Sequence, residues 1–91
     1  MSTLAIRTLR RQAKANTRII ARNLRTAVRK NGVTVNDLRA IERRYYLPAG
    51  RLFLALTGMK ISVSSMLVLH TELGMAVSDV FAGTRTMDAA V

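Results

Sequence analysis

The stretch LPAGRLFLALTGMKISVSSMLVLHTELGMAVSDVF, residues 47–81, decides the fold, because it holds two apolar runs that each stop at a glycine. In the first run, Leu52, Ala55 and Leu56 fall on one face of a helix. Pro48 suits the first turn of such a helix, where its missing N–H costs little, and Gly58 suits its end. The spacing therefore predicts a third helix of roughly ten residues.

The second run predicts a fourth helix that begins at Ser62 and ends at Gly74. The residues expected to face the core are Met66, Leu67, Leu69 and Leu73. A short last turn from about Ser78 then places Val80 and Phe81 over the core. We expect the tail, residues 82–91, to fray, because it has no periodic apolar face.

Residues 31–46 predict a turn followed by a second helix. Asn31 and Gly32 tolerate the positive φ that the end of a preceding helix requires. Thr34 stands three residues before Asp37, which is the spacing of a capping box. The helix that this box opens is expected to run through Leu38, Ile41 and Tyr45.

The N-terminal third carries almost all of the net charge of +10, because nine Lys and Arg residues fall in the first 30 positions and no carboxylate precedes Asp37. Seven of these cations are spaced by three or four residues and form one narrow stripe on a helix, here called the basic stripe: Arg7, Arg11, Lys14, Arg18, Arg22, Arg25 and Arg29. Apolar residues recur at helical spacing away from it: Ile6, Leu9, Ala13, Ile20, Leu24, Ala27 and Val28. The segment from about Leu4 to Lys30 is therefore amphipathic.

Asn16 and Thr17 leave two alternatives open for this segment. Both are poor interior helix residues, and either is suited to cap a second helix. Residues 1–15 are then either a separate basic arm or the extension of one long helix. The sequence does not decide between them.

The composition indicates one small all-α domain without catalytic chemistry. The chain has 91 residues, of which 49% are hydrophobic and 4% aromatic, so its core is built from Leu, Ile, Val, Ala and Met. Cysteine is absent and His70 is the single histidine, so we expect no enzyme activity, no metal and no cofactor. We expect His70 to be packed rather than catalytic. No apolar run reaches the ~20 residues of a membrane span, and the early arginines interrupt any secretory signal, so we expect a soluble cytoplasmic protein.

The basic stripe favours a nucleic-acid partner. A merely solvated face usually mixes acidic and basic side chains, whereas this one has no carboxylate. Two other interpretations stay open. A basic amphipathic helix is able to lie on anionic lipid, although the first 40 residues contain no Trp, Phe or Tyr. A mitochondrial targeting peptide shares the arginine-rich, acid-free composition.

Several of these segments together resemble the lambda-repressor/Cro-like (XRE) family of helix-turn-helix domains. The matching segments are Asn23-Leu24-Arg25, the break at Gly32, Leu38, residues 47–58, Ile61-Ser62-Val63 through Leu69, Leu73-Gly74-Met75 and Val80-Phe81. The resemblance implies a five-helix DNA-binding domain over residues 16–81, preceded by the basic segment 1–15 and followed by the tail 82–91. It also implies that the third helix enters the major groove, commonly in a homodimer on a two-fold operator.

The chain departs from the family pattern at two places. Between Leu38 and Leu47 it is a few residues longer than the family's usual spacing. Its third helix is also unusually apolar, so that only Arg51 is suited to a bidentate contact with guanine, and Phe53 or Leu54 to contact with thymine methyls. We therefore expect thin base readout and many phosphate contacts.

The predicted DNA-binding residues fall into three groups. The base-reading candidates are Pro48, Ala49, Gly50, Arg51, Phe53 and Leu54. The phosphate-contacting candidates are Arg18, Arg22, Thr34, Asn36, Arg43, Arg44, Tyr46 and Lys60. The minor-groove or arm candidates are Arg7, Arg10, Arg11 and Lys14. For Tyr45 and Tyr46, stacking, donation to phosphate and a place in the core all stay open.

These observations predict a sequence-specific, double-stranded DNA-binding transcriptional repressor that acts in a bacterial cytoplasm or nucleoid. We expect the small phage repressor or Cro type, because the chain ends soon after the predicted domain, and we expect no small-molecule ligand. The alternative is a protein-interaction module on the same scaffold, such as an antitoxin or an antagonist of a host factor. That module would use the exposed Phe53 and Leu54 as an adhesive patch.

Overall fold

The computed structural model describes residues 3–84, with the backbone alone for residues 4–6, 9, 10 and 12. Within this range the chain forms helices and no strand, which confirms the all-α prediction. The helices are α1 (Thr3–Lys30), α2 (Val35–Arg44), α3 (Arg51–Thr57), α4 (Val63–Leu73) and α5 (Val77–Val80). None of the helices that the structure describes combines the length and the apolar composition needed to cross a membrane.

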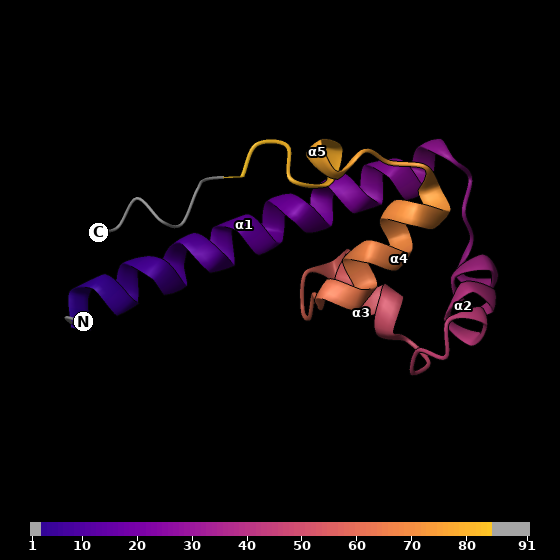
Figure 1. Cartoon of the computed structure of the whole chain (residues 1–91), viewed down its shortest axis with the longest axis horizontal. Helices are drawn as coiled ribbons and strands as arrows, with labels where there is room; N and C mark the ends of the chain where they lie inside the picture. The colour runs from indigo at the N-terminus through magenta and orange to yellow at the C-terminus, as the bar shows by residue number, and fades with distance from the viewer. Residues whose placement is uncertain (1–2, 85–91) are drawn as a thin grey trace.

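Helix α1 is continuous, which settles the alternative that the sequence left open between one helix and two. Its 28 residues correspond to about 42 Å at ~1.5 Å per residue, close to the longest dimension of 44 Å. Thr17 is accommodated in mid-helix because its hydroxyl donates to the Ala13 carbonyl at 2.8 Å. The other helices gather around the C-terminal half of α1, so its indigo N-terminal half projects beyond them (Figure 1).

The predicted capping box opens α2. The Thr34 N–H donates to Asp37 Oδ2 at 2.8 Å, and the Asp37 N–H donates to Thr34 Oγ1 at 3.2 Å. The hydrogen bond from the Thr34 backbone, and after it the one from the Thr34 hydroxyl, lower the pKa of Asp37. The box thus places a carboxylate at the positive end of the α2 dipole.

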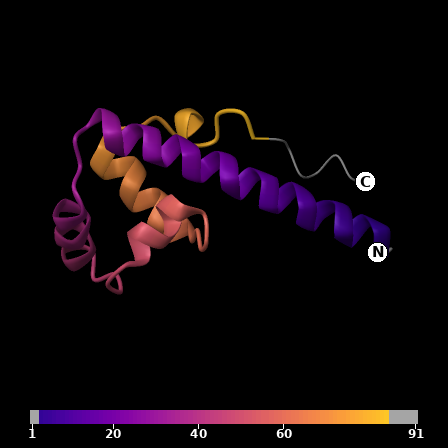
Figure 2. The same cartoon turned by 180° about the vertical axis from the view of Figure 1, so that it is seen from behind.

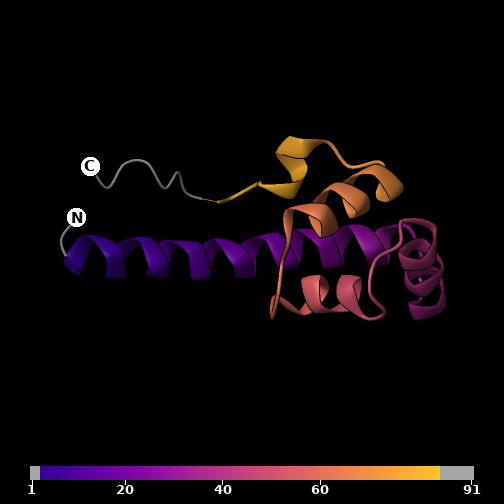
Figure 3. The same cartoon turned by 60° about the horizontal axis from the view of Figure 1, so that its bottom comes forward.

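The core lies where α3, α4 and α5 meet the C-terminal half of α1, and Leu38 and Ile41 of α2 also belong to it. Leu24 of α1, Leu52 of α3 and Leu69 of α4 are fully buried, and Val80 of α5 closes the cluster at 2% exposed. Burying a side chain of this size stabilises the fold by about 1.5–3 kcal/mol. Helix α3 contacts α1, α2 and α4, and so it links α2 to the rest of the molecule (Figure 3).

The third helix is shorter than predicted. It begins at Arg51 rather than near Pro48 and has seven residues. The reason is Gly50, whose φ of +85° lies in the left-handed region, so no right-handed helix is able to pass through it. Gly58 ends the helix as predicted, and a Cβ there would lie 3.4 Å from that of Ala21 on α1.

Two apolar residues expected to cover the core point outward instead. Leu67 is 56% exposed and Phe81 is 42% exposed. Leu67, Val68 and Leu69 are consecutive, so they project about 100° apart on α4, and only Val68 and Leu69 reach the core. The small Ser65 of α4 is instead fully buried, and its hydroxyl lies 2.8 Å from that of Ser62.

The chain after α5 turns back along α1. Asn23 Nδ2 donates to the carbonyls of Val80 and Ala82, both at 2.9 Å, and so fixes α5 and the following turn on the α1 surface. The yellow segment beside α1 follows this course (Figure 2). The rest of the predicted tail, residues 85–91, lies outside the described residues.

Candidate nucleic-acid interface

The basic stripe lies on one continuous helix. Its exposed members are Arg7, Arg11, Lys14, Arg18, Arg22 and Arg29. From Arg7 to Arg29 the stripe extends about 33 Å at ~1.5 Å per residue, which is close to one turn of duplex DNA. None of these side chains forms an ion pair within the described part of the chain, where Arg44–Glu72 is the one pair found. Six cations therefore project from α1 without a carboxylate partner.

Arg25 is the member of the stripe that packs inward. It is half-buried, and its Nη1 donates to the Leu56 carbonyl at 2.6 Å. Leu56 lies in the last turn of α3, where carbonyls lack partners within the helix and the dipole favours a cation. The stripe thus runs along the side of α1 that meets the C-terminal end of α3.

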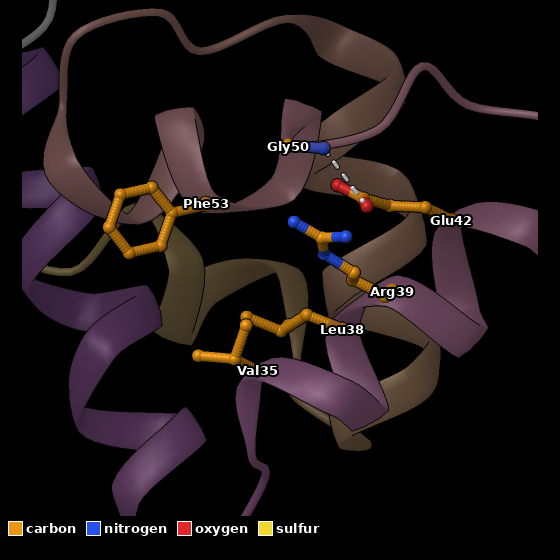
Figure 4. A pocket seen from close by; sticks show the side chains of 6 residues that line it. All are labelled: Val35, Leu38, Arg39, Glu42, Gly50 and Phe53. Carbon is orange, nitrogen blue, oxygen red and sulfur yellow. Dashed lines mark hydrogen bonds between the residues drawn. The ribbon is translucent and has the colours of Figure 1, made fainter.

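A buried carboxylate holds the N-terminal end of α3. Glu42 of α2 is 2% exposed, and its Oε1 accepts from the Gly50 N–H at 3.1 Å (Figure 4). Its Oε2 accepts from the Leu52 N–H at 2.8 Å. The Glu42 carbonyl also accepts from the Leu47 N–H at 2.8 Å. This carboxylate takes the place of the missing side-chain cap at Gly50 and occupies the positive end of the α3 dipole.

An apolar hollow of about 260 Å³ lies between α2 and α3, beside the contact that Glu42 makes. It is lined by Val35, Leu38, Arg39, Glu42, Gly50 and Phe53. In Figure 4 the Arg39 guanidinium lies near the centre of the view, with Phe53 on one side of it, the Glu42 carboxylate on another, and Val35 and Leu38 below. Because Val35 is 58% exposed and Phe53 is 54% exposed, the hollow offers an apolar surface to a partner.

The predicted base-reading residues do not all lie on α3. Pro48 and Ala49 are exposed in the loop before it and Gly50 is its N-terminal cap, so these three lie outside the helix, and their part in base readout stays a prediction. Arg51 is the first residue of α3 and is half-buried. Phe53 lies on α3 and is exposed, and Leu54, the next residue of the helix, is half-buried.

The phosphate candidates are all exposed but are distributed over several parts of the molecule. Thr34 and Asn36 stand at the start of α2, and Arg43, Arg44 and Tyr46 at its other end (all exposed). Ten residues of helix separate these ends by about 15 Å. Lys60 is exposed on the turn after α3, and Arg18 and Arg22 belong to the basic stripe on α1. The side chain of Arg10 lies outside the described residues.

The two tyrosines after α2 have different environments. Tyr45 forms a hydrogen bond with Glu72 of α4, which raises the pKa of Tyr45. The same carboxylate accepts from Arg44 Nη1 at 2.7 Å, so Arg44 is partly neutralised. Tyr46 is 95% exposed and its φ is +57°, a conformation that is strained for a bulky side chain. Neither tyrosine fills the core.

Sequence reasoning missed Glu42 and Arg39. The one signal for Glu42 was indirect: residues 45–50, directly before α3, include no Ser, Thr, Asp or Asn, so the free N–H groups of the helix needed an acceptor from elsewhere in the chain. For Arg39, the signal was its place on α2 one turn after the apolar Val35, at a spacing that puts both on one helix face.

Comparisons with models of known protein families, with curated proteins and with solved structures find no match for this chain. The likeness to the lambda-repressor/Cro-like family therefore stays a prediction from the sequence. Within the described residues, no three His, Asp or Glu side chains lie close enough together to hold a metal ion.

Proposed function

We propose that this chain is a sequence-specific, double-stranded DNA-binding transcriptional repressor. In this proposal the α2–α3 unit is a helix-turn-helix of the lambda-repressor/Cro-like type, and two copies bind a two-fold operator in the bacterial cytoplasm or nucleoid. The observation that carries the proposal is the basic stripe, with six exposed cations on one continuous helix and no carboxylate among them.

The charge distribution favours a duplex over a simple anion. The stripe extends over about one turn of DNA, so its cations match a row of phosphates rather than a single charged group. Each neutralised phosphate releases condensed counterions, so the whole stripe contributes to affinity without reading sequence. The N-terminal half of α1 stands clear of the other helices, and so it is accessible to a molecule as wide as a duplex (Figures 1 and 3).

The α2–α3 surface supplies the proposed sequence readout. Arg51 is the residue of α3 suited to a bidentate contact with guanine. Phe53 and Val35 at the mouth of the apolar hollow are suited to contact with thymine methyls. Because Glu42 already occupies the N-terminal end of α3, phosphate binding falls to the stripe and to exposed side chains such as Arg43 and Lys60.

A mobility shift on random duplex DNA tests the proposal. Arg18→Ala and Arg22→Ala each remove one exposed stripe cation and should weaken binding. Lys30→Ala is the matched control, because Lys30 is an exposed cation of the same helix that lies off the stripe. Equal weakening by all three substitutions would mean that only net charge matters. Absence of duplex binding by the unmodified chain would reject the proposal.

The apolar hollow favours a second candidate function, a protein-interaction module on the same scaffold. An antitoxin or an antagonist of a host factor would insert an apolar side chain between Val35 and Phe53. This candidate predicts little binding to random duplex DNA at moderate salt, whereas the DNA-binding proposal predicts binding that is tight at low salt and falls steeply as salt rises.

A further inference from the structure

The α4–α5 face is apolar and exposed. Val63 and Leu67, one turn apart on α4, are 67% and 56% exposed. Val77 is 55% exposed on α5, and Phe81 directly after α5 is 42% exposed. Every Lys and Arg of the chain lies outside residues 61–81. Large apolar side chains that gather on one surface in this way usually mark a site of association.

A groove runs between the two rows of exposed side chains. It has a volume of about 90 Å³ and is lined by Val63, Met66, Leu67, His70, Val77, Val80 and Phe81. Because apolar side chains line it, the groove suits an apolar side chain of a partner. The α4–α5 face therefore carries both a ridge, formed by Val63 and Leu67, and a groove beside it.

We propose that the α4–α5 face binds the same face of a second copy of this chain, with the ridge of each copy in the groove of the other. In a two-fold contact the same surface of each copy meets its counterpart, so that surface must carry both the ridge and the groove that receives it. The α4–α5 face carries both. The inference deepens the homodimer of the proposed function by assigning its surface, and it does not depend on DNA binding.

The distribution of charged residues favours a second copy of this chain over other partners for the α4–α5 face. Two chains of net charge +10 repel each other, and they repel least where neither presents a cation. A polyanion or an acidic protein is attracted to the stripe rather than to this face. A membrane surface is also disfavoured, because residues 61–81 contain no Lys or Arg for anionic lipid and no Trp or Tyr for the interface.

His70 gives this face one polar feature. Its Nδ1 is buried beside the groove and has no hydrogen-bond partner in the described part of the chain. Buried polar atoms of folded proteins are nearly always hydrogen-bonded. The occupant of the groove is therefore expected to bring a hydrogen-bonding group to Nδ1.

Sedimentation equilibrium over a hundred-fold range of concentration tests the inference. The unmodified chain should be a dimer at the upper end of this range, and Leu67→Arg should be monomeric throughout. Phe53→Arg is the matched control, because Phe53 is 54% exposed against 56% for Leu67 and gains the same charge on α3. It should stay dimeric. Circular dichroism of both variants should match that of the unmodified chain.

Three results would overturn the assignment: an unmodified chain that is monomeric at every concentration, a Leu67→Arg variant that still dimerises, or a Phe53→Arg variant that dissociates equally. The failure of this inference and the failure of the proposed function are distinguishable. Monomeric Leu67→Arg keeps the whole basic stripe and should still shift random duplex DNA. A chain that dimerises without shifting DNA would reject the function and leave the surface assignment intact.

Discussion

The buried carboxylate of Glu42 accepts a hydrogen bond from the backbone N–H of Leu52 at 2.8 Å, so a side chain of α2 fixes the first turn of α3. The same carboxylate accepts from the Gly50 N–H at 3.1 Å, and this second bond fixes the residue whose positive φ starts the helix. The orientation of α3, and with it that of Arg51 and Phe53, therefore depends on an internal negative charge.

Glu42→Ala should lower the free energy of unfolding by about 2–4 kcal/mol, because two backbone donors at a buried helix end lose a charged acceptor. Glu42→Gln is the graded control, since its amide keeps one oxygen acceptor and should cost less. Denaturant unfolding followed by circular dichroism measures both. A change below about 0.5 kcal/mol for Glu42→Ala would mean that the hydrogen bonds from Gly50 and Leu52 to Glu42, together called the Glu42 clamp, do not contribute to stability.

Tyr46→Gly should raise the free energy of unfolding by about 1 kcal/mol, because glycine adopts the φ of +57° without the strain that a bulky residue bears there. Tyr46 is 95% exposed, so few contacts are lost. Tyr46→Ala removes the same ring but keeps the strain, and it should leave stability nearly unchanged. Equal effects of the two substitutions in denaturant unfolding would contradict the interpretation that the backbone of Tyr46 is strained. If Tyr46 contacts DNA, Tyr46→Gly should also weaken duplex binding.

The capping box of α2 should make stability depend on pH in the acidic range. The folded state lowers the pKa of Asp37 through hydrogen bonds from Thr34, so the stabilisation is present above the ordinary value of 3.8 and is lost as pH falls through the lowered value. Asp37→Asn keeps the shape but removes the charge. Its thermal midpoint should lie below that of the unmodified chain at neutral pH and approach it as the pH falls below the ordinary value of 3.8. A difference in midpoint that does not change with pH would contradict this linkage.

Arg51→Ala should reduce discrimination between operator and random DNA, at a cost of about 1–3 kcal/mol on the operator alone. Arg18→Ala should weaken binding to both DNAs about equally, because Arg18 belongs to the basic stripe on α1 and is not a residue of α3. The operator sequence is obtained by selecting bound sequences from a random pool. Competition titrations then measure, for each variant, the affinity for operator relative to random DNA. Equal losses on the two DNAs for Arg51→Ala would remove Arg51 from the readout.

The helix content was predictable because its signals are local in the sequence. The Thr34 and Asp37 box, the glycine ends and the periodic leucines specify helices without help from the rest of the chain. The start of α3 was not predictable, because the Glu42 clamp acts across eight residues to Gly50 and ten to Leu52. The outward direction of Leu67 also needed the tertiary structure, since its neighbours Val68 and Leu69 are equally apolar and compete for the core.

The candidate site was predictable in its charge and less so in its shape. The basic stripe is a periodic pattern along one helix, so the sequence contains it in full. The hollow between α2 and α3 is lined by Val35 of one helix and Phe53 of the other, and no local pattern encodes that two such distant residues face the same hollow. The sequence was also unable to separate Tyr45, which binds Glu72, from its exposed neighbour Tyr46.

The salt dependence of duplex binding tests the central claim most directly. If each of the six exposed stripe cations neutralises one phosphate, log K should fall with log salt at a slope of about −5, from ~0.9 per contact. Arg22→Ala should make the slope shallower by about one unit, and Lys30→Ala should leave it unchanged. A slope shallower than about −2, or no binding at low salt, would contradict the assignment of α1 as a phosphate-binding helix.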